Sequence, residues 1–414
     1  MDNMGKSCVK NCILDKALVF LFSAAIVWFI IFSAYYRHSI KAVLLVSFIT
    51  LVIICFREQM SGLSASVRRY LSSIYVPFIF FGLSAFVSTI FSKDFGHSVG
   101  FFFERYLLYF IVFEIGRYFF VSKTVSRIFK ELLGVNIFEF MKYIFIFAGL
   151  FMGIGGVVDY IRFHPVRLWT VFGHEIQFLM LPLYISYFLP VVYCFMFKGN
   201  TFRQRISAFL AVVMLIMGMI FTGTRAVWIA GSIGMLFVSL LIDKKHLKYF
   251  IPGFLVCFYV IHFIMSARLS DFGTGTWLVR LDIMQAAVDI FRDNVLFGAG
   301  PGMYEKLVYS YSKGAVYIHA HNMYLEILAE FGIVGLIAFL AIFINFYWRV
   351  FKNISMLKTS ANRFLYAGLL ASNVACLIFA FFGSIITVGF HDAPMFWLIF
   401  GMSFGLGQRL NIGV

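Results

Sequence analysis

Long apolar runs divide this chain and constrain its fold more than any other feature. A helix needs about 20 consecutive apolar residues to cross the roughly 30 Å of hydrocarbon in a bilayer, and about twelve runs approach that length. They cover residues 17–35, 39–56, 70–91, 98–120, 137–158, 175–197, 207–221, 225–242, 249–267, 322–347, 364–382 and 393–408. Only 13% of all residues are charged, against about 25% in a soluble domain. We therefore expect an all-α, polytopic integral membrane protein.

The basic residues indicate how the predicted spans are oriented. When the connecting loops are assigned alternately to two sides, one side carries three times as many Lys and Arg residues as the other, leaving the longest loop aside. The more positive side faces the cytoplasm, so we expect both termini to be cytoplasmic. Topology then explains most of the net charge of +15, and no nucleic-acid partner is expected. The six cysteines form neither a disulfide framework nor a metal-binding pattern.

The longest hydrophilic loop, 268–321, then faces outward. It separates nine predicted spans in 1–267 from three in 322–414. Loops of this length in a compact fold usually carry function or are disordered, and this loop is not of low complexity. We therefore expect it to contain short helices and to carry function.

Two local patterns occur in this loop. Apolar residues recur at helical spacing in VRLDIMQAAVDIFRDN and predict an amphipathic helix over 279–292, with an apolar face formed by Leu281, Met284, Val288 and Phe291. The stretch GAGPGM that follows contains three glycines. It lacks the preceding strand of a dinucleotide-binding fingerprint, so it predicts a helix-ending turn in which the backbone approaches another segment closely.

The segment HAHN begins the next apolar run with His319, His321 and Asn322. Histidine can accept and return a proton near neutral pH, so two histidines on the side that bears the loop indicate either catalysis or a structural role at the interface. A metal site would need further ligands. The available side chains show no recognised spacing: Glu326, His164, His174 and His391. We expect no metal and no cofactor.

Three arginines are candidate anion-binding residues. Arg225 lies in TGTRAVW between two apolar runs, on the side that is otherwise poor in positive charge. A guanidinium group suits phosphate because it can donate two parallel hydrogen bonds, although a lone arginine at a membrane edge also sets topology. Arg280 lies at the start of the predicted loop helix. The alternative to anion binding is that it is simply exposed to solvent. Arg105 lies in FFFERYL within an apolar run, where an ion pair with Glu104 is the alternative.

Three ordered segments resemble the conserved blocks of the O-antigen ligase superfamily: TGTRAVW, RLDIMQAAVDIFRDNVLFGAGPGMY and HNMYLEILAEFGIVGLIAF. The resemblance covers roughly residues 210–345. Members use a glycan on undecaprenyl pyrophosphate at the outer face of the bacterial inner membrane. Twelve or so spans with a large periplasmic loop is the ligase pattern, so the resemblance implies a lipopolysaccharide O-antigen ligase. An O-antigen polymerase with the same donor is the alternative.

The resemblance also implies roles for the candidate residues. His321, directly before Asn322, corresponds to the catalytic histidine, and Arg225 and Arg280 correspond to the arginines that hold the donor pyrophosphate. His319, Asn322 and Arg105 are expected to contact substrate. The implied reaction is a metal-independent, inverting transfer to lipid A–core as the acceptor, with both substrates reached through the membrane lipids.

A membrane transporter is the main rival from another class. Carriers often contain internal repeats and ionisable residues near the middle of the membrane. No repeat between the two halves of this chain is evident. Few acidic residues lie within the predicted spans; Glu104 and Glu114 are examples. The clustered histidines and arginines on one side therefore favour an enzyme.

Overall fold

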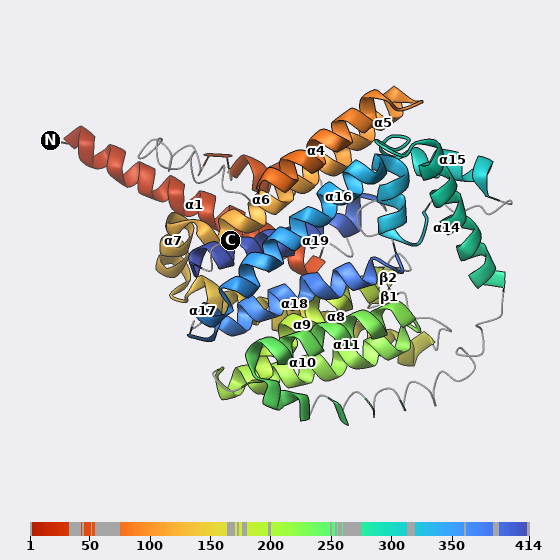
Figure 1. The fold of residues 1–414 in the computed structure, drawn as a ribbon. Helices are drawn as coiled ribbons and strands as arrows, with labels where there is room; N and C mark the ends of the chain where they lie inside the picture. The colour runs from red at the N-terminus through yellow and green to blue at the C-terminus, as the bar shows by residue number, and fades with distance from the viewer. Residues whose placement is uncertain are drawn as a thin grey trace.

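Apolar helices make up most of the computed structural model, shown as a ribbon in Figure 1. The structure describes residues 2–32, 43, 45–50, 52–53, 75–163, 170–171, 174–175, 180–197, 200–248, 251–252, 255, 259, 275–312, 319–359, 362–383 and 389–411. Its elements are α1 (Asp2–Phe32), α4 (Tyr75–Ile90), α5 (Phe95–Phe101), η1 (Phe102–Leu107), α6 (Leu108–Val121), α7 (Lys123–Leu133), α8 (Ile137–Phe163), β1 (Thr170–Val171), β2 (His174–Glu175), α9 (Met180–Tyr193), η2 (Cys194–Met196), α10 (Phe202–Phe221), α11 (Arg225–Ile242), η3 (Lys244–His246), α14 (Gly275–Asp293), α15 (Met303–Tyr311), α16 (Met323–Lys352), α17 (Ile354–Thr359), α18 (Arg363–Phe379) and α19 (Gly389–Arg409).

The described residues confirm the prediction of a helical chain with candidate membrane spans, and the number of twelve spans stays a prediction. Within the described residues, α8, α10, α11 and α16 are each long and apolar enough to cross a membrane, and α4, α9 with η2, and α18 are shorter apolar helices. The predicted spans at 39–56 and 249–267 lie largely outside the described residues. The strands β1 and β2 form a two-residue antiparallel pair in which Thr170 faces Glu175.

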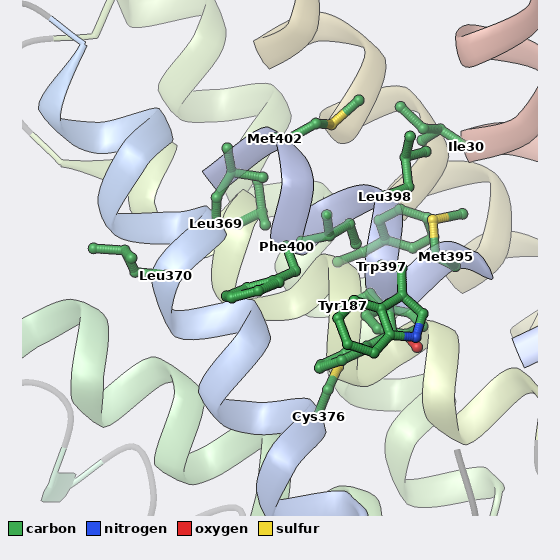
Figure 2. Packing of buried hydrophobic residues seen from close by; sticks show 14 of the residues in the cluster. Ile30, Tyr187, Leu369, Leu370, Cys376, Met395, Trp397, Leu398, Phe400 and Met402 are labelled. Carbon is green, nitrogen blue, oxygen red and sulfur yellow. The ribbon is translucent and has the colours of Figure 1, made fainter. Parts of the chain in front are cut away.

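A buried core forms where α9, α18 and α19 meet. Figure 2 shows Tyr187 of α9, Cys376 of α18, and Trp397 and Phe400 of α19 packed together. Ser372 Oγ on α18 donates a hydrogen bond to Tyr187 O on α9 (2.9 Å). Helices in a membrane gain stability from this kind of close packing and from such hydrogen bonds between helices.

Hydrogen bonds between helices show which helix ends lie together. At the start of α16, Met323 N–H donates to Ala380 O at the end of α18 (2.9 Å), and Tyr324 OH donates to Leu377 O (2.8 Å). At the other end of α18, Cys194 Sγ at the end of α9 donates to Phe364 O (2.9 Å). The helix α18 is therefore antiparallel to both α9 and α16, and the starts of α9 and α16 lie at one end of the bundle.

The helix α11 runs parallel to α9. Tyr193 OH lies 3.3 Å from Ser239 Oγ, and a methyl group on Gly234 would contact the Pro190 ring. Arg225, which begins α11, therefore lies at the same end of the bundle as Met323. We call this the site end; α14 and α15 lie beside it in Figure 1.

The opposite end of the bundle, which we call the basic end, is rich in arginine and lysine. Positively charged residues lie where helices end there: Arg117, Lys244, Lys245, Arg349, Lys352, Arg363 and Arg409. In Figure 1, α1 begins and α19 ends on this side, away from α14 and α15. All of these residues belong to the loops that the sequence assigns to the more positive side.

The helix α16 is broken at Gly332, which has φ 65° and ψ −168°. A break leaves backbone groups on both sides without their helical partners. The segment after α14 supplies those partners. Four hydrogen bonds join them: Ala299 N–H to Ala329 O (2.9 Å), Gly300 N–H to Glu330 O (3.1 Å), Ile333 N–H to Val295 O (2.9 Å) and Val334 N–H to Leu296 O (3.3 Å). The loop therefore completes the backbone hydrogen bonding of an apolar helix.

Glycine is required on both sides of this contact. A Cβ atom on Gly332 would overlap the Leu296 carbonyl, and one on Gly298 would overlap the Glu330 carbonyl. Gly298 also has a positive φ of 71°, which residues with a side chain rarely adopt. The turn predicted from GAGPGM thus approaches another segment closely, and that segment is the break in α16.

The loop elements α14 and α15 pack on the first half of α16. Tyr304 OH of α15 donates to Ile283 O of α14 (2.9 Å). The helix α14 confirms the expected amphipathic helix, but Leu281 of the predicted apolar face is 45% exposed, and Met284, Val288 and Phe291 are only half-buried. The buried face lies one residue earlier: Ile283, Ala286, Ala287 and Ile290. Its two alanines are small and allow the neighbouring helices to approach closely.

Polar contacts also dock α15 on the turn between α4 and α5. Lys306 Nζ lies 2.6 Å from Asp94 Oδ2, and His97 Nε2 lies 3.1 Å from Gly302 O. Ser98 Oγ donates to Pro301 O (3.0 Å). The loop therefore contacts both α16 and α5.

We predict that Gly332→Ala destabilises the protein. With φ 65° and ψ −168° Gly332 occupies a region that is essentially restricted to glycine, so alanine there costs on the order of 1–3 kcal/mol, and overlap with Leu296 adds to that cost. The measurement is thermal unfolding in detergent, with Gly100→Ala as the control, since a Cβ atom there would meet nothing within 4 Å. Equal unfolding temperatures for the two variants would contradict the contact described here.

Candidate functional site

A buried carboxylate holds the segment that leads into α16. Glu326, in the first turn of α16, accepts a hydrogen bond from Ala320 N–H at Oε2 (3.2 Å), and its Oε1 lies 3.4 Å from His319 Nδ1. His321 follows in a left-handed conformation with φ 50°, which few residues other than glycine adopt. One carboxylate thus contacts the chain at two points just before His321.

Arg280 of α14 lies near His321. The pKa of His321 is lowered to about 4, first because the ring is largely buried and then because Arg280 and His319 are close by, while Glu326 opposes the shift. A histidine in water titrates near about 6.5. The imidazole is therefore neutral at pH 7 and able to accept a proton. Arg280 is thus close enough to act electrostatically on His321, and the roles of both residues stay predictions.

Arg225 begins α11 at the site end of the bundle. The surrounding TGTRAVW turn is tied to the end of α10, because Thr222 Oγ1 and Trp228 Nε1 each donate to Met219 O (2.8 Å in both cases). The charged groups that shift the pKa of His321 are Arg280, His319 and Glu326. The structure thus places Arg225 at the same end of the bundle as His321, and its role in binding phosphate stays a prediction.

Arg105 lies on the π-helical turn η1, beside the break in α16. Such turns occur frequently at functional sites. The Arg105 guanidinium lies over the Phe101 ring, 3.9 Å from its centroid, and acts electrostatically on the buried Glu330. Glu330 Oε1 accepts a hydrogen bond from Tyr304 N–H (3.3 Å), so Glu330 caps the start of α15 from another helix. A contact between Arg105 and substrate stays a prediction.

Asn322 is the N-cap of α16. Its side-chain oxygen accepts hydrogen bonds from Tyr324 N–H (3.0 Å) and Leu325 N–H (3.2 Å). Asparagine is among the preferred residues at this position because it satisfies backbone donors that lack a helical partner. This cap fixes where α16 begins, directly after His321, and contact of Asn322 with substrate stays a prediction.

From the sequence, Glu326 was expected only as a possible metal ligand, and no role was expected for Glu330. Both are 2% exposed and lie within an apolar helix. Acidic residues four apart share one face of a helix, and carboxyl groups in an apolar span usually have a role because burial is costly. That spacing was the available signal. Within the described part of the chain, no three His, Cys, Asp or Glu side chains are grouped to hold a metal ion.

A family model described as O-antigen ligase matches residues 209–340, which include Arg225, Arg280, His319 and His321. No curated protein matches the chain. The matched segment runs from α10 to the middle of α16 and contains the break at Gly332.

We predict that His321→Asn makes the protein less sensitive to acid. The wild-type ring has a lower pKa folded than unfolded, so its stabilising effect is full above about pH 6.5 and is lost as the pH falls toward about 4. Between pH 7 and pH 5 the free energy of unfolding of the wild type should fall by about 1–2 kcal/mol more than that of the variant. Asparagine tolerates the left-handed conformation. Thermal unfolding in detergent at both pH values provides the measurement, and equal losses would contradict the lowered pKa.

Proposed function

We propose that this chain is a lipopolysaccharide O-antigen ligase, and a family model described as O-antigen ligase, which matches residues 209–340, supports the proposal. It would move O-antigen glycan from undecaprenyl pyrophosphate to lipid A–core. The observation that carries the proposal is the proximity of Arg280 to a neutral His321, inside the matched segment and at the end of the bundle that also bears Arg225. This pairs a proton acceptor with groups that bind phosphate.

The proposed reaction is a single displacement. An acceptor hydroxyl oxygen attacks the anomeric carbon of the donor sugar, and its proton passes to His321. The bond between that carbon and the diphosphate oxygen breaks, and its electron pair leaves with the diphosphate. Attack opposite the leaving group inverts the anomeric configuration. Arg225 and Arg280 would stabilise the charge that grows on the diphosphate, which is electrostatic stabilisation of the transition state.

Donor binding would also strengthen His321 as a base. In the free protein Arg280 helps to hold the pKa of His321 low. A diphosphate bound to Arg280 would offset that positive charge and place negative charge nearby, which favours the protonated imidazole. A base is most effective when its pKa lies near the working pH. The same arginine would therefore bind the leaving group and regulate the base.

The proposed orientation follows from the two ends of the bundle. The basic end would face the cytoplasm, with both termini there, and the site end would face the periplasm of the bacterial inner membrane. The proposed division is nine spans in 1–267, a periplasmic loop over 268–321 and three spans in 322–414. Both lipid-linked substrates would then reach the site laterally from the outer leaflet.

We predict that His321→Ala lowers the rate of transfer at least about 100-fold, because a positioned general base typically contributes about 100- to 10,000-fold. Arg225→Lys and Arg280→Lys should also impair transfer strongly, since lysine lacks the planar fork that binds phosphate at two points. The measurement is silver-stained lipopolysaccharide from a deletion strain that expresses each variant. Arg292→Lys is the matched control, because Arg292 is 66% exposed and pairs with Asp289 on the same helix as Arg280.

The deletion strain itself distinguishes ligase from polymerase. Loss of a ligase leaves rough lipopolysaccharide and lipid-linked glycan that accumulates, whereas loss of a polymerase leaves lipopolysaccharide capped with a single unit. Normal capping in the His321→Ala strain would rule out the base role. Full activity of Arg225→Lys would show that Arg225 sets topology only.

We further predict two different acid limbs in the pH–rate profiles of the purified enzyme. The limb of kcat/KM reports the free enzyme and that of kcat reports the complex with donor. Because diphosphate should raise the pKa of His321, the limb of kcat should lie at higher pH than that of kcat/KM. Coincident limbs would show that donor binding leaves the base unchanged.

A further inference from the structure

We propose that Glu326 and His319 are positioning residues for His321: together they hold the chain that precedes His321, so that its ring lies beside Arg280. This inference rests on the proposed function, because it assigns the base role to His321. It gives His319 a structural partner in place of the substrate contact expected from the sequence.

The first argument is geometric. Ala320 is fully buried, in the cluster that α14 and α15 form with α16. Its N–H group would be a buried donor without a partner if Glu326 Oε2 did not accept its hydrogen bond, and such a group costs about 1–3 kcal/mol. The carboxylate therefore fixes the backbone one residue before His321.

The second argument concerns the backbone of His321 itself. With φ 50° it occupies a conformation that is unfavourable for a residue with a side chain. Such a residue persists only where its surroundings hold it on both sides. Glu326 holds the chain before it and the Asn322 cap fixes the helix start after it. The Glu326 hydrogen bond and the Asn322 cap both depend on the first turn of α16.

The third argument separates the two histidines. The Nδ1 atom of His319 faces Glu326 Oε1 at 3.4 Å, and the His319 side chain is 15% exposed. A neighbouring carboxylate fixes the orientation of an imidazole ring, as it does for many catalytic and metal-binding histidines. His319 is thus engaged within the protein, which leaves His321 as the histidine beside Arg280.

The pKa of His321 gives a measurement that tests the positioning role, because a purely structural role of Glu326 would leave that pKa unchanged. Arg280 from α14, His319 from the same segment and Glu326 from α16 are the charged groups that face it. Glu326 is the one that favours the protonated ring. Removing its negative charge while keeping its shape should therefore lower the pKa of His321.

Glu326→Gln is the variant that keeps the shape. The glutamine carbonyl can accept the Ala320 hydrogen bond and its amide can donate to His319. We expect it to retain protection of the Ala320 amide in hydrogen–deuterium exchange and to shift the acid limb of kcat/KM to lower pH. Glu326→Ala should lose that protection and lower kcat by about 10- to 100-fold with little change in KM, because the base is misplaced.

Asp289→Asn is the matched control. It removes a carboxylate from α14 that pairs with Arg292 and Gln285, and it should leave both exchange and the pH profile unchanged. His319→Ala should lower kcat less than His321→Ala and should increase exchange at Ala320. A His319→Ala protein that is as inactive as His321→Ala, with unchanged exchange, would show that His319 meets the substrate and would overturn the proposal.

The outcomes separate this inference from the proposed function. Wild-type protection and wild-type kcat in Glu326→Ala would overturn the positioning role while His321→Ala still tests the function. Glu326→Gln without the shift in the acid limb would also count against it. If the wild-type protein transfers no glycan, the function fails, and loss of protection in Glu326→Ala but not in Glu326→Gln still decides whether Glu326 holds the segment.

Discussion

The break in α16 is the constraint on which the site depends. An apolar helix normally satisfies its own backbone groups, and Gly332 interrupts that pattern. The chain after α14 restores it with four backbone hydrogen bonds. Since the loop thereby becomes part of the helix's own bonding, α14 and α15 cannot move independently of α16. Arg280 is consequently fixed relative to the start of α16, where His321 lies.

Two buried carboxylates extend this arrangement along one face of α16. Glu330, two residues before the break, binds the start of α15, and Glu326, about one turn nearer the helix start, binds the segment before His321. Each carboxylate contacts a different part of the chain outside the helix. Buried carboxyl groups are costly, and here they join the loop and the site segment to a rigid element.

Particular residues show how far sequence reasoning reaches. The positions of His319, His321, Asn322, Arg225 and Arg280 at one end of a helical protein follow from apolar runs, charge bias and the resemblance to a family. The helix around 279–292 was also predictable, but its most buried face was not, since the adjacent Ile283 and Met284 are both apolar. Local spacing could not decide between two faces that differ by one residue.

The sequence by itself determined an apolar, all-helical protein, a basic end opposite the end that bears the histidines, and a glycine-rich turn that approaches another segment. These properties depend on local composition and on hydrogen bonding along the chain. Only the tertiary structure decided that the turn meets the break at Gly332, that Glu326 holds His319 and Ala320, and that Arg280 lowers the pKa of His321. Those contacts join residues that local sequence pattern does not pair, and they depend on how the loop packs against α16.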